Sequence, residues 1–254
     1  MAKDKTVYVC SNCGQESAKW IGKCPSCGQW NTFKELRVSA DTGSLAARNA
    51  AVDMHRAMSH SGAKPMFLKD ISSQDEPRID MHDNELNRVL GGGLVRGSIV
   101  LLGGEPGIGK STLTLQTVLN MPDRRILYVS GEESAHQLKM RAMRINPDAA
   151  DNVMILCETS LEDIFKHIAE VKPEFVVIDS IQTISTADVD SSPGSVTQVR
   201  ECASALLRFA KTSGVPVLLI GHINKEGTIA GPKILEHIVD TVIQFEGDNH
   251  YMYR

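Results

Sequence analysis

A short segment near the middle of the chain constrains its fold more than any other feature. Residues 104–111 read Gly-Glu-Pro-Gly-Ile-Gly-Lys-Ser and fit the pattern G-x-x-x-x-G-K-[ST] completely. The apolar run Ile99–Leu102 precedes this segment, and helix-forming residues follow it. A strand, a glycine-rich turn and a helix form the context in which the pattern binds phosphate. The alternative, a chance glycine-rich turn, does not account for that context.

Each part of the segment has a defined role toward a nucleotide. Backbone N–H groups of such a loop surround phosphate oxygens, and the N-terminus of the following helix adds partial positive charge. We expect Lys110 to reach the β- and γ-phosphates of ATP and the hydroxyl of Ser111 to bind Mg²⁺. The predicted nucleotide-binding residues are Gly104, Glu105, Pro106, Gly107, Ile108, Gly109, Lys110, Ser111 and Thr112.

From about Asp70 onward, short apolar runs alternate with longer mixed segments. The runs are rich in Val, Ile and Leu, as expected of strands that are covered on both faces. This order predicts an α/β fold with a mostly parallel central sheet. The predicted strands are Ser98–Leu102, Ile126–Ser130, Val153–Leu156, Phe175–Ile178, Val215–Ile220 and Thr241–Phe245. The predicted helices are Lys110–Leu119, Ala135–Arg144, Leu161–Glu170, Ser195–Lys211 and a short one near Leu235–Val239.

Acidic residues follow two of the predicted strands. Asp179 comes directly after Phe175–Ile178, where a carboxylate can anchor Mg²⁺ together with the loop serine. Glu132 and Glu133 follow Ile126–Ser130. Hydrolysis needs a carboxylate that orients and deprotonates water, and ligands gather at the carboxyl ends of parallel strands. We predict Glu132 for this role, with Glu133 as the alternative; either could instead be an acid that favours a helix N-terminus.

Four of the six cysteines lie within the first 27 residues, as two Cys-x-x-Cys pairs. Cys10 and Cys13 form the first pair, and Cys24 and Cys27 form the second. Two such turns present four thiolates, which suits a tetrahedral zinc site. Because thiolates alone do not select the metal, a rubredoxin-like iron site is the alternative. In a module this short, the metal should supply much of the folding free energy.

Composition divides the chain into three parts. Residues 1–36 form the four-cysteine module, 37–68 form a linker without sustained periodicity, and 69–254 form the α/β core. The whole chain has a net charge of −4, yet residues 1–37 carry six basic and three acidic residues. A basic N-terminal part therefore precedes an acidic core.

The two tryptophans and the two remaining cysteines are expected to have structural roles. Trp20 and Trp30 flank the second cysteine pair, and packing within the module is favoured over stacking on nucleic-acid bases. Cys157 and Cys202 are isolated in the sequence and are expected to be ordinary buried residues.

Composition also excludes several classes of protein. Hydrophobic residues make up 42% and charged residues 23% of the chain, which is near the average of globular proteins and argues against a wholly disordered chain. No run approaches the length of a membrane-spanning helix, and the first residues lack the features of a signal peptide. We expect a soluble, cytoplasmic protein without a membrane partner.

A four-cysteine module joined to this phosphate loop resembles the bacterial RadA (Sms) family of RecA-related DNA repair proteins. The resemblance extends over essentially the whole chain. It is carried by CSNCGQESAKWIGKCPSCGQWN at 10–31, LNRVLGGGLVRGS at 86–98, GGEPGIGKSTL at 103–113, YVSGEES at 128–134, VVIDSIQT at 176–183, SSPGSVTQVRE at 191–201 and GHINKEGTIAGPKILEHIVD at 221–240.

The resemblance implies a RecA-like P-loop ATPase core behind a small rubredoxin-like zinc module, with ATP or ADP, Mg²⁺ and Zn²⁺ as cofactors. It implies binding of single-stranded or branched DNA, and a DNA-stimulated, helicase-like motor that drives branch migration and strand exchange in recombinational repair. Family members assemble as rings, usually hexamers, with ATP between neighbouring subunits. A recombinase or a replicative helicase is a candidate partner.

The resemblance also assigns roles to individual residues. It implies catalytic roles for Glu132, as the glutamate that activates water, for Lys110, and for His222, as a sensor of the γ-phosphate. The alternative for His222 is a strand-end histidine satisfied by the backbone.

Two segments match the central DNA-facing loops of this family, Thr186–Gly194 and Ile223–Lys233. Within the second, Lys225 and Lys233 are the predicted contacts to DNA phosphates. The alternative is that both are solvated surface lysines.

The chain departs from the family pattern at its end. Family members continue with a Lys-Asn-Arg-Phe-Gly motif and a Lon-protease-like domain, whereas this sequence stops at Arg254. We therefore expect a truncated chain that binds ATP and zinc but hydrolyses ATP weakly. The alternative functions are a nucleotide-gated module that binds a partner, and a KaiC-like signalling ATPase without DNA motor activity.

Overall fold

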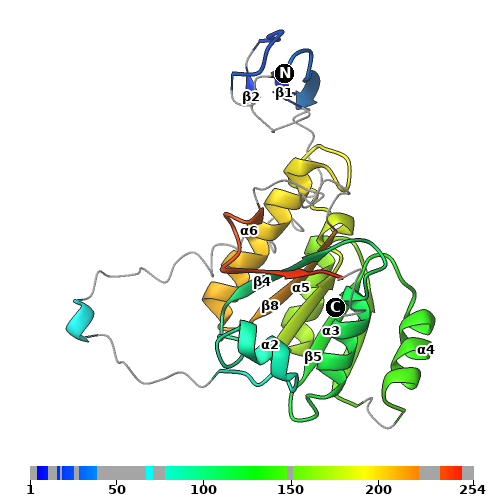
Figure 1. Cartoon of the computed structure of the whole chain (residues 1–254). Helices are drawn as coiled ribbons and strands as arrows, with labels where there is room; N and C mark the ends of the chain where they lie inside the picture. The colour runs from blue at the N-terminus through cyan, green and yellow to red at the C-terminus, as the bar shows by residue number, and fades with distance from the viewer. Residues whose placement is uncertain are drawn as a thin grey trace. The chain divides into compact units, whose positions relative to one another are not determined.

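The computed structural model describes residues 5–10, 16–17, 19–25, 29–38, 67–70, 78–147, 151–222 and 235–247. The chain separates into two compact units, Met1–Pro77 and Arg78–Arg254. Each unit has its own sheet, as Figure 1 shows. Within the described residues, no helix is both long and apolar enough to cross a membrane.

The first unit contains a small antiparallel sheet in the order β2-β1-β3. Its strands are β1 Lys5–Cys10, β2 Glu16–Ser17 and β3 Phe33–Val38. Cys10 pairs with Phe33 across β1 and β3, and these two residues form a small buried cluster with Cys24. The 3-10 helix η1, Leu68–Asp70, also belongs to this unit. A core of this size is too small to stabilise a fold without further support.

The second unit contains a six-stranded sheet in the order β6-β5-β7-β8-β4-β9, in which every pairing of neighbouring strands is parallel. This confirms the predicted α/β core. The strands are β4 Ile99–Gly104, β5 Ile126–Ser130, β6 Val153–Cys157, β7 Phe175–Asp179, β8 Val217–His222 and β9 Thr241–Phe245. The helices are α2 Asn84–Val89, α3 Lys110–Leu119, α4 Ala135–Ile145, α5 Leu161–Val171, η2 Ile181–Thr183 and α6 Val196–Ser213.

Element boundaries differ from the prediction where local chemistry decides them. The strand β8 begins at Val217 and not at the predicted Val215, because Pro216 has no N–H to give to a ladder. The predicted short helix near Leu235–Val239 is only one turn: Leu235 is in 3-10 conformation, and its carbonyl accepts from the N–H groups of Ile238 and Val239 in the turn that follows. The short helix α2, capped by the side chain of Asp83, was not predicted.

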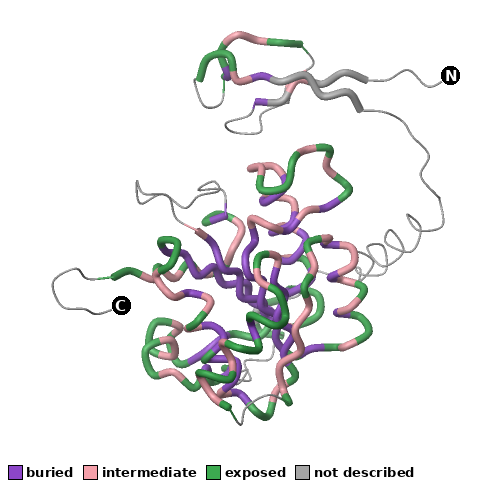
Figure 2. The backbone as a smooth tube through the Cα atoms, turned by 90° about the vertical axis from the view of Figure 1, so that its right-hand side faces the viewer, coloured by how far each residue is buried: buried purple, intermediate pink, exposed green. Residues whose placement is uncertain are grey.

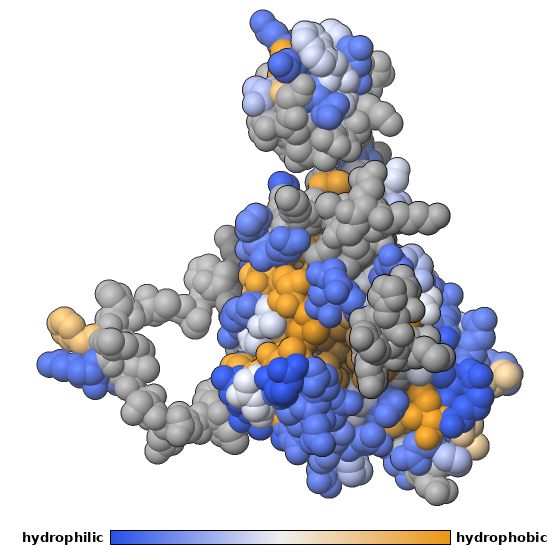
Figure 3. Space-filling model, viewed as in Figure 1, coloured by the Kyte–Doolittle hydropathy of each residue, from blue (hydrophilic) through white to orange (hydrophobic). Residues whose placement is uncertain are grey.

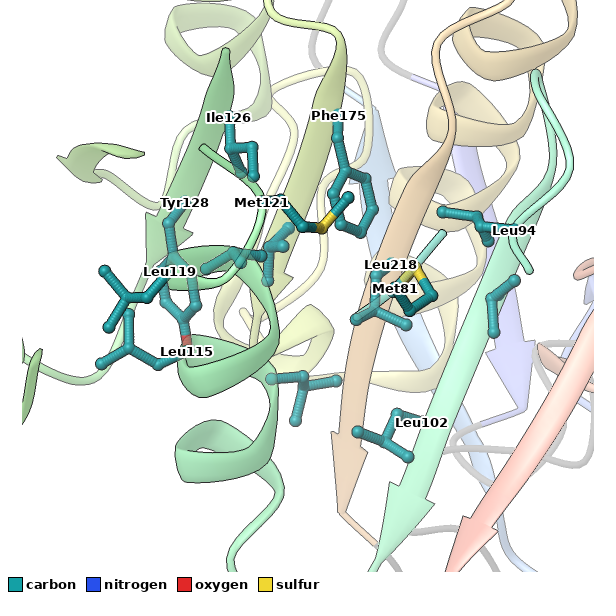
Figure 4. Packing of buried hydrophobic residues seen from close by; sticks show 14 of the residues in the cluster. Met81, Leu94, Leu102, Leu115, Leu119, Met121, Ile126, Tyr128, Phe175 and Leu218 are labelled. Carbon is teal, nitrogen blue, oxygen red and sulfur yellow. The ribbon is translucent and has the colours of Figure 1, made fainter. Parts of the chain in front are cut away.

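Alternate residues of the central strands face α3 and α4. Val100, Tyr128, Val177 and Leu218 belong to one buried cluster with apolar side chains of these helices. Figure 4 shows Leu115 of α3 packed toward the ring of Tyr128. Figure 2 shows that the strands at the centre of this unit are buried, whereas the helices around them carry the exposed residues.

The opposite face of the sheet is covered by α5 and α6. Successive strand residues point to opposite faces, and Leu101 and Ile178 are fully buried on this second face. The rings of Phe165 on α5 and Phe209 on α6 lie 5.8 Å apart. At the edge of the sheet, β9 alternates between half-buried and exposed residues, and Figure 3 shows apolar residues among hydrophilic ones in this region.

The strand register brings four chain segments to one end of the sheet. Gly104 at the end of β4 lies opposite His222 at the end of β8. Asp179 at the end of β7 lies opposite Ile220 of β8 on one side and opposite Ser130 of β5 on the other. The phosphate loop and the acidic residues after β5 and β7 therefore meet at the carboxyl edge, where ligands bind in open α/β sheets.

Candidate nucleotide-binding site

The predicted phosphate loop connects β4 to α3 and depends on two glycines. Gly109 has a φ of 114° at the N-cap of α3, a conformation that side chains with a Cβ rarely adopt. A Cβ on Gly104 would lie 2.6 Å from the carbonyl oxygen of Phe245 on β9, which is too close for any other residue. The loop therefore leads from the end of β4 to the N-terminus of α3, where backbone N–H groups can bind phosphate.

The side chain of Lys110 lies buried inside this loop. Its ammonium group donates hydrogen bonds to the carbonyl oxygens of Gly104, at 2.7 Å, and Glu105, at 2.9 Å. Burial lowers the pKa of Lys110, while the nearby charges of Asp179 and Glu132 act to raise it. Asp179 and Glu132, the two predicted carboxylates, therefore lie close enough to Lys110 for their charges to affect its ammonium group.

Asp179 has the oxygen chemistry that Mg²⁺ prefers. Burial raises the pKa of Asp179, although hydrogen bonds from Tyr128 and Ser111 act to lower it. The Tyr128 hydroxyl donates to Oδ2 of Asp179 at 2.6 Å. A buried carboxylate beside the Ser111 hydroxyl is a suitable pair of oxygen ligands for Mg²⁺, which binds through few protein groups, phosphates and water.

Glu132 is held as a hydrogen-bond acceptor near the loop. Its Oε1 accepts from the hydroxyl of Ser180 at 2.6 Å and lies 3.2 Å from Nε2 of His222. Burial raises the pKa of Glu132, but the hydrogen bonds from Ser180 and His222 and the charge of Lys110 outweigh this effect and lower it. The carboxylate is therefore ionised at neutral pH and can accept a proton from water.

Glu133, the alternative to Glu132, is engaged elsewhere. Its carboxylate forms an ion pair with Arg141 of α4 at 2.8 Å. Its backbone N–H donates to the hydroxyl of Ser130. This geometry favours Glu132 as the residue that faces the nucleotide.

His222 lies at the end of β8 and contacts Glu132 through Nε2. Its other ring nitrogen, Nδ1, is buried and has no hydrogen-bond partner among the residues that the structure describes. This arrangement differs from the alternative in which the backbone satisfies the histidine. Lys225 and Lys233, the predicted DNA contacts, lie outside the described residues.

The first predicted DNA-facing loop, Thr186–Gly194, is held by a buried amide. The side chain of Gln198 on α6 accepts from the N–H of Thr186 and donates to the carbonyl oxygens of Thr186, Val189 and Ser191. From the other side, Glu162 of α5 accepts from the hydroxyl of Thr186 and the N–H of Ala187. The part of the loop from Thr186 to Ser191 is therefore held by side chains of α5 and α6.

Two of the four predicted zinc ligands are described, and they share one cluster. Cys10 and Cys24 are both almost fully buried, and the thiol of Cys10 lies 3.1 Å from the hydroxyl of Thr32. Two buried thiols in one small cluster are compatible with thiolate ligation of zinc. Cys13 and Cys27 lie outside the described residues.

Three expectations about side chains need correction. Trp20 and Trp30 do not fill the interior of the module, because they are 53% and 67% exposed. Cys157 is exposed and not buried. Cys202 is buried as predicted, and burial raises the pKa of its thiol to about 12, so it remains protonated.

Sequence reasoning missed the hydroxyl partners of the two carboxylates, Tyr128 and Ser180. Ser180 is adjacent to Asp179 in the sequence, yet it contacts Glu132. Tyr128 contacts Asp179 across the sheet. The available signal was the position of Ser180 directly after one predicted strand and of Tyr128, a residue with a hydroxyl, inside another. Which carboxylate each one meets depends on the pairing of β5 with β7.

Comparison with family models agrees with both units. The model described as "AAA domain" matches residues 65–228, and the model described as "Rubredoxin metal binding domain" matches residues 8–35. A solved structure of a KaiC-like protein from Pyrococcus horikoshii aligns with a TM-score of 0.55 and 21% identity, covering 69% of this chain and 84% of that one. This structural likeness concerns the fold alone.

Curated relatives match the chain along its whole length. Three of them, each named DNA repair protein RadA, come from Bacillus subtilis (48% identical), Halalkalibacterium halodurans (49%) and Listeria monocytogenes (48%). Each alignment covers 100% of this chain and 54% of the relative. The chain therefore spans about half the length of the curated relatives that it matches.

Proposed function

Since this chain belongs to the AAA domain family and matches relatives named DNA repair protein RadA, we propose that it is an ATP-hydrolysing motor of DNA repair. The observation that carries the proposal is the convergence of Lys110, Asp179 and Glu132 at the end of one parallel sheet. A phosphate loop, a metal-binding carboxylate and a water-activating carboxylate are the parts that phosphoryl transfer to water requires.

Each residue of the site has one task in this proposal. The backbone of the phosphate loop and the ammonium of Lys110 bind the β- and γ-phosphates. Ser111 and Asp179 would hold Mg²⁺, which would neutralise charge on the phosphate oxygens. Glu132 accepts a proton from the attacking water, and His222 ties the position of Glu132 to the end of β8. The phosphate loop, Lys110 and Glu132 therefore orient ATP and the attacking water before the reaction.

DNA is the second ligand of the proposed motor. The two predicted loops differ in charge, because Thr186–Gly194 contains Asp188 and Asp190 and no basic residue, whereas Ile223–Lys233 contains Lys225 and Lys233. Phosphate contacts supply most of the affinity for nucleic acid. We therefore assign the phosphate contacts to the second loop, through Lys225 and Lys233.

The proposed motor acts as a ring of identical subunits, with single-stranded or branched DNA as its track and a recombinase or replicative helicase as a candidate partner. The exposed position of Glu132 supports an active site that another subunit completes, since its side chain is 46% accessible in the isolated chain. The zinc module carries a net positive charge, whereas the whole chain has a net charge of −4. The module is therefore a candidate region for contact with DNA or a partner.

The test is ATP turnover with and without a single-stranded oligonucleotide. The measurement compares this chain with a longer one that extends to the length of the curated relatives. Stimulation by DNA that weakens as salt rises supports the motor. If both chains bind ATP and DNA stimulates neither, the alternative of a nucleotide-gated module that binds a partner replaces it. Autophosphorylation without DNA would favour a signalling ATPase of the KaiC-like type.

A further inference from the structure

Each carboxylate of the site is held by a hydroxyl group that comes from the neighbouring strand. The strands β5 and β7 pair in parallel, with Ser130 opposite Asp179. Tyr128 of β5 donates its hydroxyl to Oδ2 of Asp179, which ends β7, at 2.6 Å. In the opposite direction, Ser180 after β7 donates to Oε1 of Glu132, which follows β5, at 2.6 Å. The two hydrogen bonds therefore cross between the strands.

The hydroxyl of Tyr128 is fixed because its ring is fixed. Tyr128 is completely buried, and Figure 4 shows its ring beside Leu115 and Leu119 of α3. Helix α3 begins at Lys110, so the element that packs against the ring also carries the lysine and serine of the phosphate loop. A polar atom buried among apolar side chains is costly unless it is hydrogen bonded. Asp179 satisfies the hydroxyl, and the packed ring in turn restricts the carboxylate.

Ser180 acts on a more exposed carboxylate. Ser180 is itself completely buried, whereas the side chain of Glu132 is 46% accessible. An exposed glutamate samples several rotamers, and fixing it costs conformational entropy. The short hydrogen bond from Ser180, together with His222 at 3.2 Å, holds Oε1 of this glutamate in one place.

We propose that Tyr128 and Ser180 are positioning residues with separate tasks. Tyr128 orients Asp179 for Mg²⁺, and Ser180 orients Glu132 for the attacking water. The inference rests on the proposed ATP hydrolysis. It adds that one hydroxyl group orients the carboxylate for metal binding and a different hydroxyl group orients the carboxylate that activates water. Partners of metal-binding groups typically change metal affinity by about 10–100-fold when removed. A base displaced by about 1 Å can lose roughly 100-fold in rate.

The test uses Tyr128→Phe and Ser180→Ala with two readouts. The first readout is binding of a fluorescent ADP analogue, titrated with Mg²⁺; the second is ATP turnover in single-turnover experiments at saturating Mg²⁺. For Y128F we expect about a tenfold or larger increase in the Mg²⁺ concentration at half-maximal binding, unchanged binding without metal, and turnover that recovers at high Mg²⁺. For S180A we expect unchanged Mg²⁺ dependence and a turnover that falls by about tenfold or more.

The matched control is Thr114→Val on α3. Thr114 is buried, and its hydroxyl has no hydrogen-bond partner in the described part of the chain, so T114V should behave like wild type in both readouts. Thermal unfolding establishes that each variant is folded. If Y128F fails to fold, the S180A variant alone still tests the inference. A turnover of S180A equal to that of wild type would overturn it.

The remaining outcomes are also distinguishable. The inference is overturned if Y128F keeps the wild-type dependence on Mg²⁺, or if S180A shifts that dependence as strongly as Y128F does. A wild-type chain that binds no nucleotide in the presence of Mg²⁺ contradicts the proposed function itself, and not only the roles of the two hydroxyl groups.

Discussion

The two adjacent glutamates after β5 differ in environment although they are neighbours in sequence. Glu132 contacts Ser180 and His222, and Glu133 forms an ion pair with Arg141. The side chains point to different partners because consecutive residues in this turn face different sides of the chain. The two glutamates are therefore expected to differ in function because their side chains have different contacts.

This difference predicts opposite results for two matched variants. Glu132→Gln should keep nucleotide binding and lose ATP turnover by about 10²–10⁴-fold, because the amide cannot accept the proton of water. Glu133→Gln should retain turnover within a few-fold, because the Glu133 carboxylate is engaged in the ion pair with Arg141 of α4. The measurement is single-turnover hydrolysis with nucleotide binding as the reference. Equal losses in both variants would contradict the assignment of Glu132.

Asp179 gives a prediction for stability. Burial raises its pKa above the unfolded value. The protonated carboxyl therefore stabilises the fold at low pH, and this contribution is lost as the pH rises through the folded pKa. At neutral pH without Mg²⁺, Asp179→Asn removes the buried charge and should raise the melting temperature. A gain of about 1 kcal/mol corresponds to roughly 2–4 °C in a chain of this size.

The measurement is thermal unfolding of the metal-free protein as a function of pH. The difference between D179N and wild type should narrow as the pH falls below about 4, because the carboxyl then becomes protonated in the unfolded chain as well as in the folded one. Asp188→Asn in the exposed part of the first loop is the control, with no expected change. A D179N variant that melts below wild type at neutral pH would show that the ionised carboxylate stabilises the metal-free fold.

At the scale of elements, α6 determines the shape of the loop before it. Gln198 is 2% exposed, and its amide makes four hydrogen bonds with the backbone of residues 186–191. The same helix begins at Val196 with its N-cap on Ser195, so the end of the loop is also fixed. Helix α6 therefore holds the loop in this shape through hydrogen bonds from its own side chains.

Gln198→Leu should release this loop. The variant keeps the approximate volume of the side chain but leaves three carbonyl groups and one N–H without their partner, and each unsatisfied buried group costs about 1–3 kcal/mol. We expect faster hydrogen exchange over residues 186–191 and a lower melting temperature. Gln116→Leu on the exposed side of α3 is the control. Unchanged exchange in the loop of Q198L would show that Glu162 alone holds it.

At the scale of the whole molecule, two units have very different means of stabilisation. The unit Arg78–Arg254 has a large apolar core on both faces of its sheet. The unit Met1–Pro77 has a small cluster around Cys10, Cys24 and Phe33. We expect a cluster of that size to depend on metal for most of its folding free energy, and the larger unit to fold through its apolar core.

Removal of zinc should therefore unfold the first unit only. The chain has two tryptophans, Trp20 and Trp30, and both lie in this unit, so tryptophan fluorescence reports on it alone. A chelator should change this fluorescence, while binding of a fluorescent nucleotide to the second unit persists. Added zinc should restore the signal. Fluorescence that is insensitive to chelation would contradict a structural metal, and loss of nucleotide binding would show that the two units depend on each other.

The sequence by itself determined the local parts of this protein. The phosphate loop, the helix after it and the buried strands follow from glycine spacing and apolar runs, which act over a few neighbouring residues. The α/β core and the rubredoxin-like module follow from the order of such segments and from the two cysteine pairs. Proline at 216 and the Asp83 cap of α2 also act locally, and a closer reading of the sequence could have found them.

Only the tertiary structure decided how these parts meet. Sequence spacing does not show that β5 lies beside β7 and that Tyr128 reaches Asp179 while Ser180 reaches Glu132. It does not show that Glu133 turns toward α4. These contacts join residues about fifty positions apart or on different elements. They depend on strand order, register and packing, which the free energy of the whole core selects and which no local pattern encodes.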